Sequence, residues 1–206
     1  MSRPIYLDNQ ATTPPDPEVV KAMLPYFQEK FGNAASVHHS YGQEGKEAVE
    51  QGRRVMAESI QASRREIIFT SGATEAINLA LKGVAEKYID RGRHIITQVT
   101  EHKSVLDTCN YLVRKGWKVT TLPVDSKGMV KPSHITKAIT RETVIVAIMH
   151  ANNEIGTIQP IQEIGTICRQ KNIFFMVDAC QSFGKLDLNV KSMNIDLLAA
   201  TAHKLY

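Results

Sequence analysis

The feature of this sequence that most constrains its fold is the alternation of short apolar runs, rich in β-branched residues, with longer amphipathic stretches. Such continuous apolar runs are typical of strands that are buried on both faces. Parallel strands need crossover connections of about a dozen residues or more, which amphipathic helices supply. The pattern therefore predicts an α/β fold, in which a mainly parallel sheet carries helices on both faces.

The expected elements follow one another without repeats, low-complexity tracts or linkers, so the 206 residues form one domain or part of one. We expect strands at residues 66–71, 94–99, 117–124, 144–150, 173–179 and 195–201. We expect helices at residues 17–29, 42–61, 74–90, 103–115, 132–139 and 161–170.

Composition and charge argue against several classes of function. The formal net charge is only +4 and the basic residues are scattered, so direct binding to nucleic acid is not expected. No stretch has the roughly 18 consecutive apolar residues of a membrane span, and residues 1–10 lack the apolar core of a secretory signal. We therefore expect a cytoplasmic protein with no membrane partner.

The three cysteines form no CxxC pair and have no histidine at zinc-binding spacing, so neither a metal site nor a disulfide framework is expected. Cys109 and Cys168 each fall on the apolar stripe of an expected helix and are interpreted as core residues. Cys180 lies nearest to the polar loops described next, between Ala179 and Gln181, and is interpreted as a small packed thiol.

Ligands of parallel sheets bind at the carboxyl ends of the strands, in the loops that lead into the following helices. In "TSGATEAIN", Gly72 permits a tight turn before a helix that starts at about Thr74. The free N–H groups and positive dipole end of such a helix bind phosphate. The alternative is ordinary N-capping by Ser71 or Thr74.

Other polar residues follow the remaining strands. Asp178 ends a buried strand, and it either caps the next helix or, with Gln181, faces a ligand with a protonated ring nitrogen. His102 either caps the helix that it precedes or stacks on a flat ring. Lys204 follows the last strand with Thr201 and His203. A lysine beside a phosphate cradle and a ring-nitrogen carboxylate is the set that holds pyridoxal 5'-phosphate (PLP) as a Schiff base.

These stretches resemble one family along the whole chain: the cysteine desulfurases of iron–sulfur cluster assembly, in the class V aminotransferase group of the fold-type I PLP enzymes. The matching segments are "IYLDNQATTP", "FGNAASVHHSYG", "EIIFTSGATEAINLA", "HIITQVTEHKSVLDTC", "IMHANNEIGTIQPI", "VDACQSFGKL" and "DLLAATAHKLY". The resemblance departs at "FGNAAS", where proline is usual before the small residue, and at "TAHK", where serine is usual at the position of Thr201.

The resemblance implies a role for each matching residue. Lys204 would form the Schiff base and, with His102, move protons during catalysis. The phosphate would be held by Ala73, Thr74, Thr201 and His203. Asp178 would pair with the pyridine nitrogen, Gln181 would contact the phenolic oxygen, His102 would stack on the ring, and Asn153 would face the cofactor and the substrate carboxylate.

The same resemblance implies an activity and partners. L-cysteine would be converted to L-alanine, and the sulfur would leave as a persulfide on a nucleophilic cysteine for an iron–sulfur scaffold protein or another acceptor. That cysteine, and the arginine that binds the substrate carboxylate, lie beyond residue 206 in the family. Residues 1–206 would be the N-terminal arm and most of the PLP-binding large domain, without its remainder or the small C-terminal domain.

Three explanations of this length stay open: a truncated chain, a split gene product, and one half of a two-chain enzyme with a complementary C-terminal polypeptide. Homodimerisation is expected from the family, because a neighbouring subunit helps to close the cofactor site. Alternative functions are another class V aminotransferase, a selenocysteine lyase, or a non-catalytic partner subunit that keeps the PLP pocket.

Overall fold

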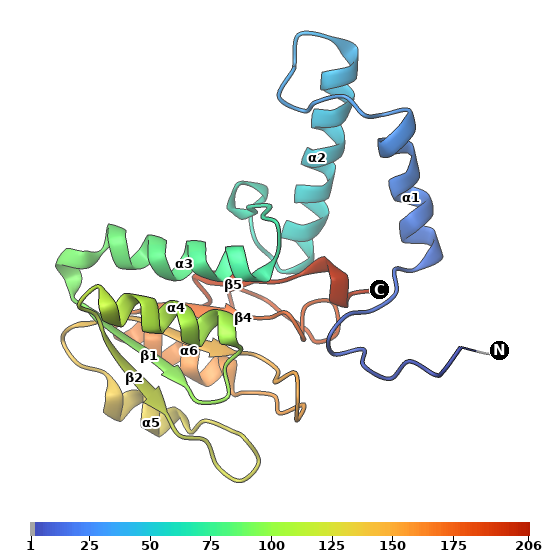
Figure 1. The fold of residues 1–206 in the computed structure, drawn as a ribbon. Coiled ribbons are helices and arrows are strands. Elements are labelled where there is room, and N and C mark those ends of the chain that lie inside the picture. Colours follow the sequence, from blue (N-terminus) through green and yellow to red (C-terminus); the bar gives the residue numbers. More distant parts are fainter. Residues whose placement is uncertain (1–2) are drawn as a thin grey trace. The chain divides into compact units, whose positions relative to one another are not determined.

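The computed structural model describes residues 3–206, which form two compact units (Figure 1). One unit comprises residues 70–201, and the other comprises residues 3–69 together with 202–206.

The larger unit is a five-stranded, fully parallel sheet in the order β2-β1-β3-β4-β5. The strands are β1 (His94–Gln98), β2 (Lys118–Leu122), β3 (Thr143–Met149), β4 (Phe174–Asp178) and β5 (Leu197–Ala199). All seven residues of β3 are buried, which agrees with a central strand covered on both faces. The parallel α/β fold expected from the sequence is confirmed.

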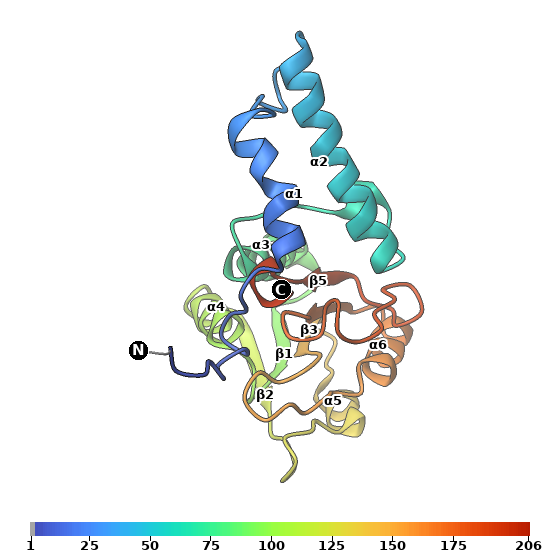
Figure 2. The ribbon, with the colours of Figure 1, turned by 90° about the vertical axis from the view of Figure 1, so that its right-hand side faces the viewer.

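Four helices cover the two faces of this sheet, as Figure 2 shows for α4 and α6 on opposite sides of the strands. They are α3 (Ala73–Lys87), α4 (Lys103–Arg114), α5 (Pro132–Ala138) and α6 (Ile161–Gln170), and a 3-10 turn, η2 (Ile89–Arg91), leads into β1. The helices α3 and α4 pack against each other on one face, and α5 and α6 pack on the other. The main core lies under α3 and α4 and contains Ile77, Leu81, Ile95, Val105, Leu112, Trp117, Ile145 and Met176.

Close packing of α6 depends on a glycine. A Cβ atom on Gly165 would lie 1.9 Å from the carbonyl oxygen of Met193, so only a residue without a side chain lets the segment before β5 approach this helix. The neighbouring Ile164 and Cys168 are fully buried on the same helix. This contact brings Met193 against α6, four positions before β5.

The smaller unit contains α1 (Pro17–Gln28), α2 (Ser40–Ser59) and two 3-10 turns, η1 (Arg64–Glu66) and η3 (Ala202–Lys204). Asp16 caps α1 by accepting a hydrogen bond from the N–H of Glu18, at 2.8 Å, and Pro17 fits the first helical position. Within residues 3–206, no helix combines the length and the apolar content that crossing a membrane requires.

The strand expected at residues 66–71 does not form, and this prediction is wrong. The segment leaves η1 without regular structure, and Ile68 and Phe69 are 69% and 50% exposed. A strand is stable only when a neighbouring strand forms main-chain hydrogen bonds with it. None of the described strands pairs with residues 66–71. The guanidinium of Arg53 instead donates to the carbonyl oxygen of Ile67 and lies over the Phe69 ring.

Candidate active site

The carboxyl ends of four neighbouring strands form one edge of the larger unit. Met149 of β3 is in register with Asp178 of β4, which in turn is in register with Ala199 of β5. The sequence-predicted residues His102, Asn153, Asp178, Gln181 and Thr201 all lie at or just after the ends of β1, β3, β4 and β5. The sheet order therefore brings these five residues to the same edge, as expected for a ligand site in a parallel sheet.

Asp178 is the acidic residue of this set, and it is buried. It is the last residue of β4, only 6% exposed, between β3 on one side and β5 on the other. Its Oδ1 atom accepts a hydrogen bond from the N–H of Cys180 at 3.0 Å, the one hydrogen bond to this carboxylate within residues 3–206. Both interpretations of Asp178 thus remain open, because it orders the following turn and retains acceptor capacity on Oδ2.

The start of α3 has no side-chain cap among the described residues. Gly72 is the N-cap residue, Thr70 Oγ1 donates to the Gly72 carbonyl oxygen at 3.0 Å, and Glu75 turns back to accept from the N–H and hydroxyl of Ser71. Capping by Ser71 or Thr74 is therefore wrong. The N–H groups of Ala73 and Thr74 have no intrahelical acceptor and are available to an anion.

The position of α3 relative to the sheet follows from the chain path. Its last turn leads through η2 into the amino end of β1, so its first turn lies toward the carboxyl edge. Ala73 and Thr74 therefore belong to the same edge as Asp178.

His102 caps α4, as one of the two interpretations predicted. Its Nδ1 atom accepts a hydrogen bond from the N–H of Ser104 at 3.1 Å and lies 2.7 Å from the Ser104 hydroxyl. The imidazole is exposed at the edge of the sheet. Capping uses only Nδ1, so the ring faces and Nε2 remain available to a ligand.

The loop after β3 is fixed by Asn152 rather than by the predicted Asn153. The Asn152 Nδ2 group donates to the carbonyl oxygen of Thr100 at 2.9 Å, and Oδ1 accepts from the N–H groups of Glu154 and Ile155. This bond ties the loop after β3 to the loop after β1. Asn153 is half-buried in the same loop, and Asn152 is the residue that sequence reasoning missed.

Gln181 and Thr201 complete the part of the edge that lies in the larger unit. Gln181 is half-buried in the turn after β4, and Thr201 is buried two residues after β5. The N–H of Ala179 donates to the carbonyl oxygen of Ala199 at 2.8 Å, so both residues extend from one continuous pair of strands.

His203 and Lys204 belong to the smaller unit, in η3. Their chain segment is held by the N-terminal arm, residues 3–16 before α1. Thr12 Oγ1 donates to the His203 carbonyl oxygen at 3.1 Å, and Thr13 donates to the same oxygen. Lys204 is half-buried and follows Thr201 by three positions. The presence of these two residues in one site with Asp178 stays a prediction.

Glu101 is a second buried carboxyl group at this edge, and no role was predicted for it from the sequence. It is 6% exposed, and burial, followed by the nearby Asp178, raises the pKa of its carboxyl group to about 8. The available indication was an acidic residue three positions after a buried strand, near its carboxyl end, as Asp178 lies at the carboxyl end of β4.

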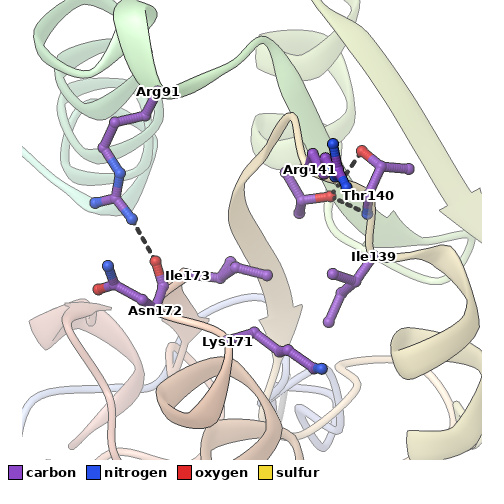
Figure 3. A pocket seen from close by; sticks show the side chains of 8 residues that line it. Arg91, Ile139, Thr140, Arg141, Lys171, Asn172 and Ile173 are labelled. Carbon is purple, nitrogen blue, oxygen red and sulfur yellow. Dashed lines mark hydrogen bonds between the residues drawn. The ribbon is translucent and has the colours of Figure 1, made fainter.

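A different depression lies at the opposite edge of the sheet (Figure 3). It has a volume of about 590 Å³ and is lined by residues before the amino ends of β1, β3 and β4, including Arg91, Arg141 and Lys171. Arg91 already donates to the carbonyl oxygen of Asn172, as the dashed line in Figure 3 shows. None of the predicted site residues lines this depression. Within residues 3–206, no group of His, Cys, Asp and Glu side chains is arranged to hold a metal ion.

The chain is similar to known proteins along its whole length. The chain is 51% identical over all its 206 residues to the cysteine desulfurase IscS of Rickettsia rickettsii, strain Iowa, and spans about half (50%) of that relative's length. Two solved structures are similar to it. "SspA in complex with cysteine" has 40% identity and a TM-score of 0.93, over 97% of this chain and 57% of that one. The apo cysteine desulfurase of Thermococcus onnurineus NA1 has 32% identity and a TM-score of 0.88, over 98% of this chain and 50% of that one.

A family model provides the assignment. The model of the class-V aminotransferases matches residues 5–206, nearly the whole chain. Together with the parallel sheet and its polar carboxyl edge, this match shows that the chain belongs to the class-V aminotransferase family.

Proposed function

We propose that residues 1–206 are the N-terminal, cofactor-binding part of a PLP-dependent cysteine desulfurase, which converts L-cysteine to L-alanine and passes the sulfur on as a persulfide. The observation that carries this proposal is the buried carboxylate of Asp178 on the same sheet edge as the uncapped start of α3. The names of the 51% identical relative and of the similar structures support the choice of substrate.

The residues present fit PLP. The free N–H groups of Ala73 and Thr74 suit a phosphate dianion, because a helix start is positive and its first N–H groups lack acceptors. The buried carboxylate of Asp178 suits a cationic ring nitrogen, which would compensate its charge. The hydroxyl of Thr201 and the side chain of His203 would add phosphate contacts.

The remaining residues would orient the cofactor. His102 would stack on the ring with its free faces, Gln181 would donate to the phenolic oxygen, and Asn153 would face the substrate carboxylate. Lys204 would attach the cofactor covalently. PLP supplies an electron sink that stabilises negative charge at the substrate Cα.

The protein would contribute to this chemistry mainly by holding protons in place. Asp178 would keep a proton on the ring nitrogen, which is the condition for effective withdrawal of electrons. The amine of Lys204, once released, and the imidazole of His102 would move the proton at the substrate Cα.

The thiol that accepts sulfur would lie outside these residues. Cys109, Cys168 and Cys180 are all buried, and burial raises the pKa of the Cys109 and Cys168 thiols to about 12. A thiol is a nucleophile only as its thiolate, so these two are unsuited to attack. Because the resemblance also places the nucleophile beyond residue 206, we propose that a C-terminal polypeptide, in the same chain or in a separate one, supplies it, with an iron–sulfur scaffold protein or another acceptor downstream.

The experiment is borohydride reduction of the PLP-treated protein followed by mass spectrometry of its peptides. We expect the reduced adduct on Lys204, no adduct in Lys204→Ala, and an unchanged adduct in Lys103→Ala, an exposed lysine beside His102. Asp178→Asn keeps an oxygen for the Cys180 N–H but loses the charge, so it should weaken PLP binding. A wild-type protein without an adduct on Lys204 would refute the proposal.

Product analysis then separates the activities. Alanine and persulfide from L-cysteine support a desulfurase, and a keto acid supports another class V aminotransferase. Turnover that requires an added C-terminal polypeptide supports a two-part enzyme. PLP binding without turnover, even with that polypeptide, supports a non-catalytic partner subunit. We further expect a homodimer located in the cytoplasm. Analytical ultracentrifugation of the PLP-loaded protein would test the dimer.

A further inference from the structure

The strands β1 and β3 separate near their carboxyl ends. Their pairing ends at Ile96 and Val146. The other neighbour of β1, strand β2, stays paired with it through Gln98, and beyond that the N–H of Val99 donates to the carbonyl oxygen of Leu122. The N–H of Met149 on β3 would therefore lack a strand partner. The side chain of Glu101 fills this gap: its Oε1 atom accepts from the N–H of Met149 at 2.6 Å.

The two oxygens of Glu101 have different surroundings. Oε1 also accepts from the Nε2 group of Gln98 at 2.9 Å, so it has two donors. Oε2 is buried and has no hydrogen-bond partner within residues 3–206. A carboxylic acid fits this arrangement, since its carbonyl oxygen accepts both hydrogen bonds and its protonated oxygen needs no donor.

Acidic groups around Glu101 favour the same protonation state. Met149, whose N–H donates to Glu101, is in register with Asp178 of β4. The N–H of the next residue, His150, donates to the carbonyl oxygen of Asp178 at 2.9 Å. Cys109 on α4 interacts electrostatically with Glu101, His102 adjoins it in the sequence and His150 adjoins Met149, and no ion pair among the described residues includes the Glu101 carboxyl group. Burial and, less strongly, the charge of Asp178 raise the pKa of Glu101 to about 8, against the hydrogen bonds from Met149 and Gln98, which favour the charged form.

We propose that Glu101 is a positioning residue that acts as a neutral carboxylic acid, holding the main chain at Met149 beside Asp178 without adding a second negative charge to the cofactor edge. This inference rests on the proposed function, because it assumes that Asp178 pairs with the ring nitrogen of PLP. An ionised Glu101 would repel Asp178 and compete with it for the cationic ring. An apolar residue would leave the Met149 N–H and the Gln98 amide without an acceptor.

Infrared spectroscopy of the cofactor-free protein tests the protonation state directly. We expect the carbonyl stretch of a protonated carboxyl group near neutral pH, with a titration midpoint near pH 8. The stretch should be absent from Glu101→Gln and unchanged in Glu154→Gln, an exposed residue of the neighbouring loop. In Asp178→Asn the midpoint should fall, because the repelling charge is gone.

Binding of PLP tests the positioning role. Glu101→Gln keeps an uncharged acceptor for Met149 and should bind PLP within about twofold of wild type, whereas Glu101→Leu should bind it at least about tenfold more weakly. In wild type, the visible absorbance of bound PLP should change with pH, at the same midpoint as the titration of the Glu101 carboxyl group. Glu101→Gln should lack this change.

The outcomes separate this inference from the proposed function. A PLP adduct on Lys204 in a protein without the protonated carboxyl signal, or with a signal that persists in Glu101→Gln, overturns the inference alone. The expected signal in a protein that forms no adduct overturns the proposed function and, with it, the role of Glu101 toward the cofactor. If Glu101→Gln fails to fold, the infrared titrations of wild type and Asp178→Asn still decide whether the Glu101 carboxyl group is protonated near neutral pH.

Discussion

Thr13 donates two hydrogen bonds to the carbonyl oxygen of His203, one from its N–H at 2.9 Å and one from its hydroxyl at 3.2 Å. The two residues are 190 positions apart in the sequence. The Thr13 hydroxyl oxygen also accepts from the N–H of Tyr206 at 2.9 Å. The N-terminal arm therefore fixes both sides of Lys204.

The first prediction concerns this link. Thr13→Val keeps the shape of the side chain but removes the hydroxyl, so the N–H of Tyr206 loses its acceptor at a cost of roughly 1–3 kcal/mol. We expect faster amide hydrogen exchange across residues 202–206, with little change in residues 70–201. The matched control is Thr166→Val, because the hydroxyl of Thr166 is exposed on α6 and bonds only within its helix. Unchanged exchange at Tyr206 would show that the arm does not hold the segment.

The second prediction is an acid sensitivity centred on His94. This buried imidazole contacts the Thr143 and Thr120 hydroxyls at 2.8 Å each, and burial, followed by the charge of Lys118, lowers its pKa below the usual 6.5. The unfolded chain binds the proton more readily, so the stabilisation from neutral His94 is present above pH 6.5 and is lost as the pH falls through the lower, folded pKa.

Urea unfolding across this pH range would measure the effect. The pKa of His150 is also lowered by burial, so a second group contributes in the same direction. His94→Asn should be less stable than wild type near neutral pH and should lose less stability on acidification. An equal loss in both proteins would assign the acid sensitivity to other groups.

The third prediction compares two glycines in helices. Gly83 of α3 has open space where a Cβ would lie, so Gly83→Ala should stabilise the protein by about 1 kcal/mol through helix propensity. Gly165→Ala should instead destabilise it by about 1–3 kcal/mol, because the Cβ would overlap the Met193 carbonyl group. Thermal unfolding of both variants provides the measurement, and equal signs would contradict the packing of α6.

The fourth prediction is that Cys109 and Cys168 take no part in sulfur transfer. Both thiols are buried with a pKa of about 12, so alkylating reagents should reach them only after unfolding. Cys109→Ala and Cys168→Ala should retain any cysteine turnover of the assembled enzyme, apart from small losses of stability. Persulfide on either sulfur, detected by mass spectrometry of the native protein, would argue against an external nucleophile.

The helices and the sheet class were predictable from the sequence because burial leaves a periodic pattern. The helix expected at residues 161–170 has the same bounds in the structure, and its buried Ile164 and Cys168 are the residues that gave the pattern. The strand expected at residues 195–201 shortens to Leu197–Ala199. Residues 66–71 show the limit of such patterns, since apolar residues indicate a tendency to pair but not the presence of a partner strand.

The candidate site was predictable in position more than in detail. Asp178 was identified because a carboxylate that follows a buried strand needs a partner. The sequence left two possibilities for the start of α3, free N–H groups or capping by Ser71 or Thr74, and only the structure decides for the first by showing Glu75 bonded to Ser71. Glu101 and Asn152 were missed because their roles come from neighbours about 50 positions away, Met149 and Thr100.

The parallel pairing of β4 with β5 has a consequence for biosynthesis. Of the strands described here, β5 is the last to leave the ribosome, and it covers one flank of Asp178. On the nascent chain this acidic strand end stays open until residue 199 has emerged. A pause in translation before that point would leave the end of β4 without β5 as its neighbour.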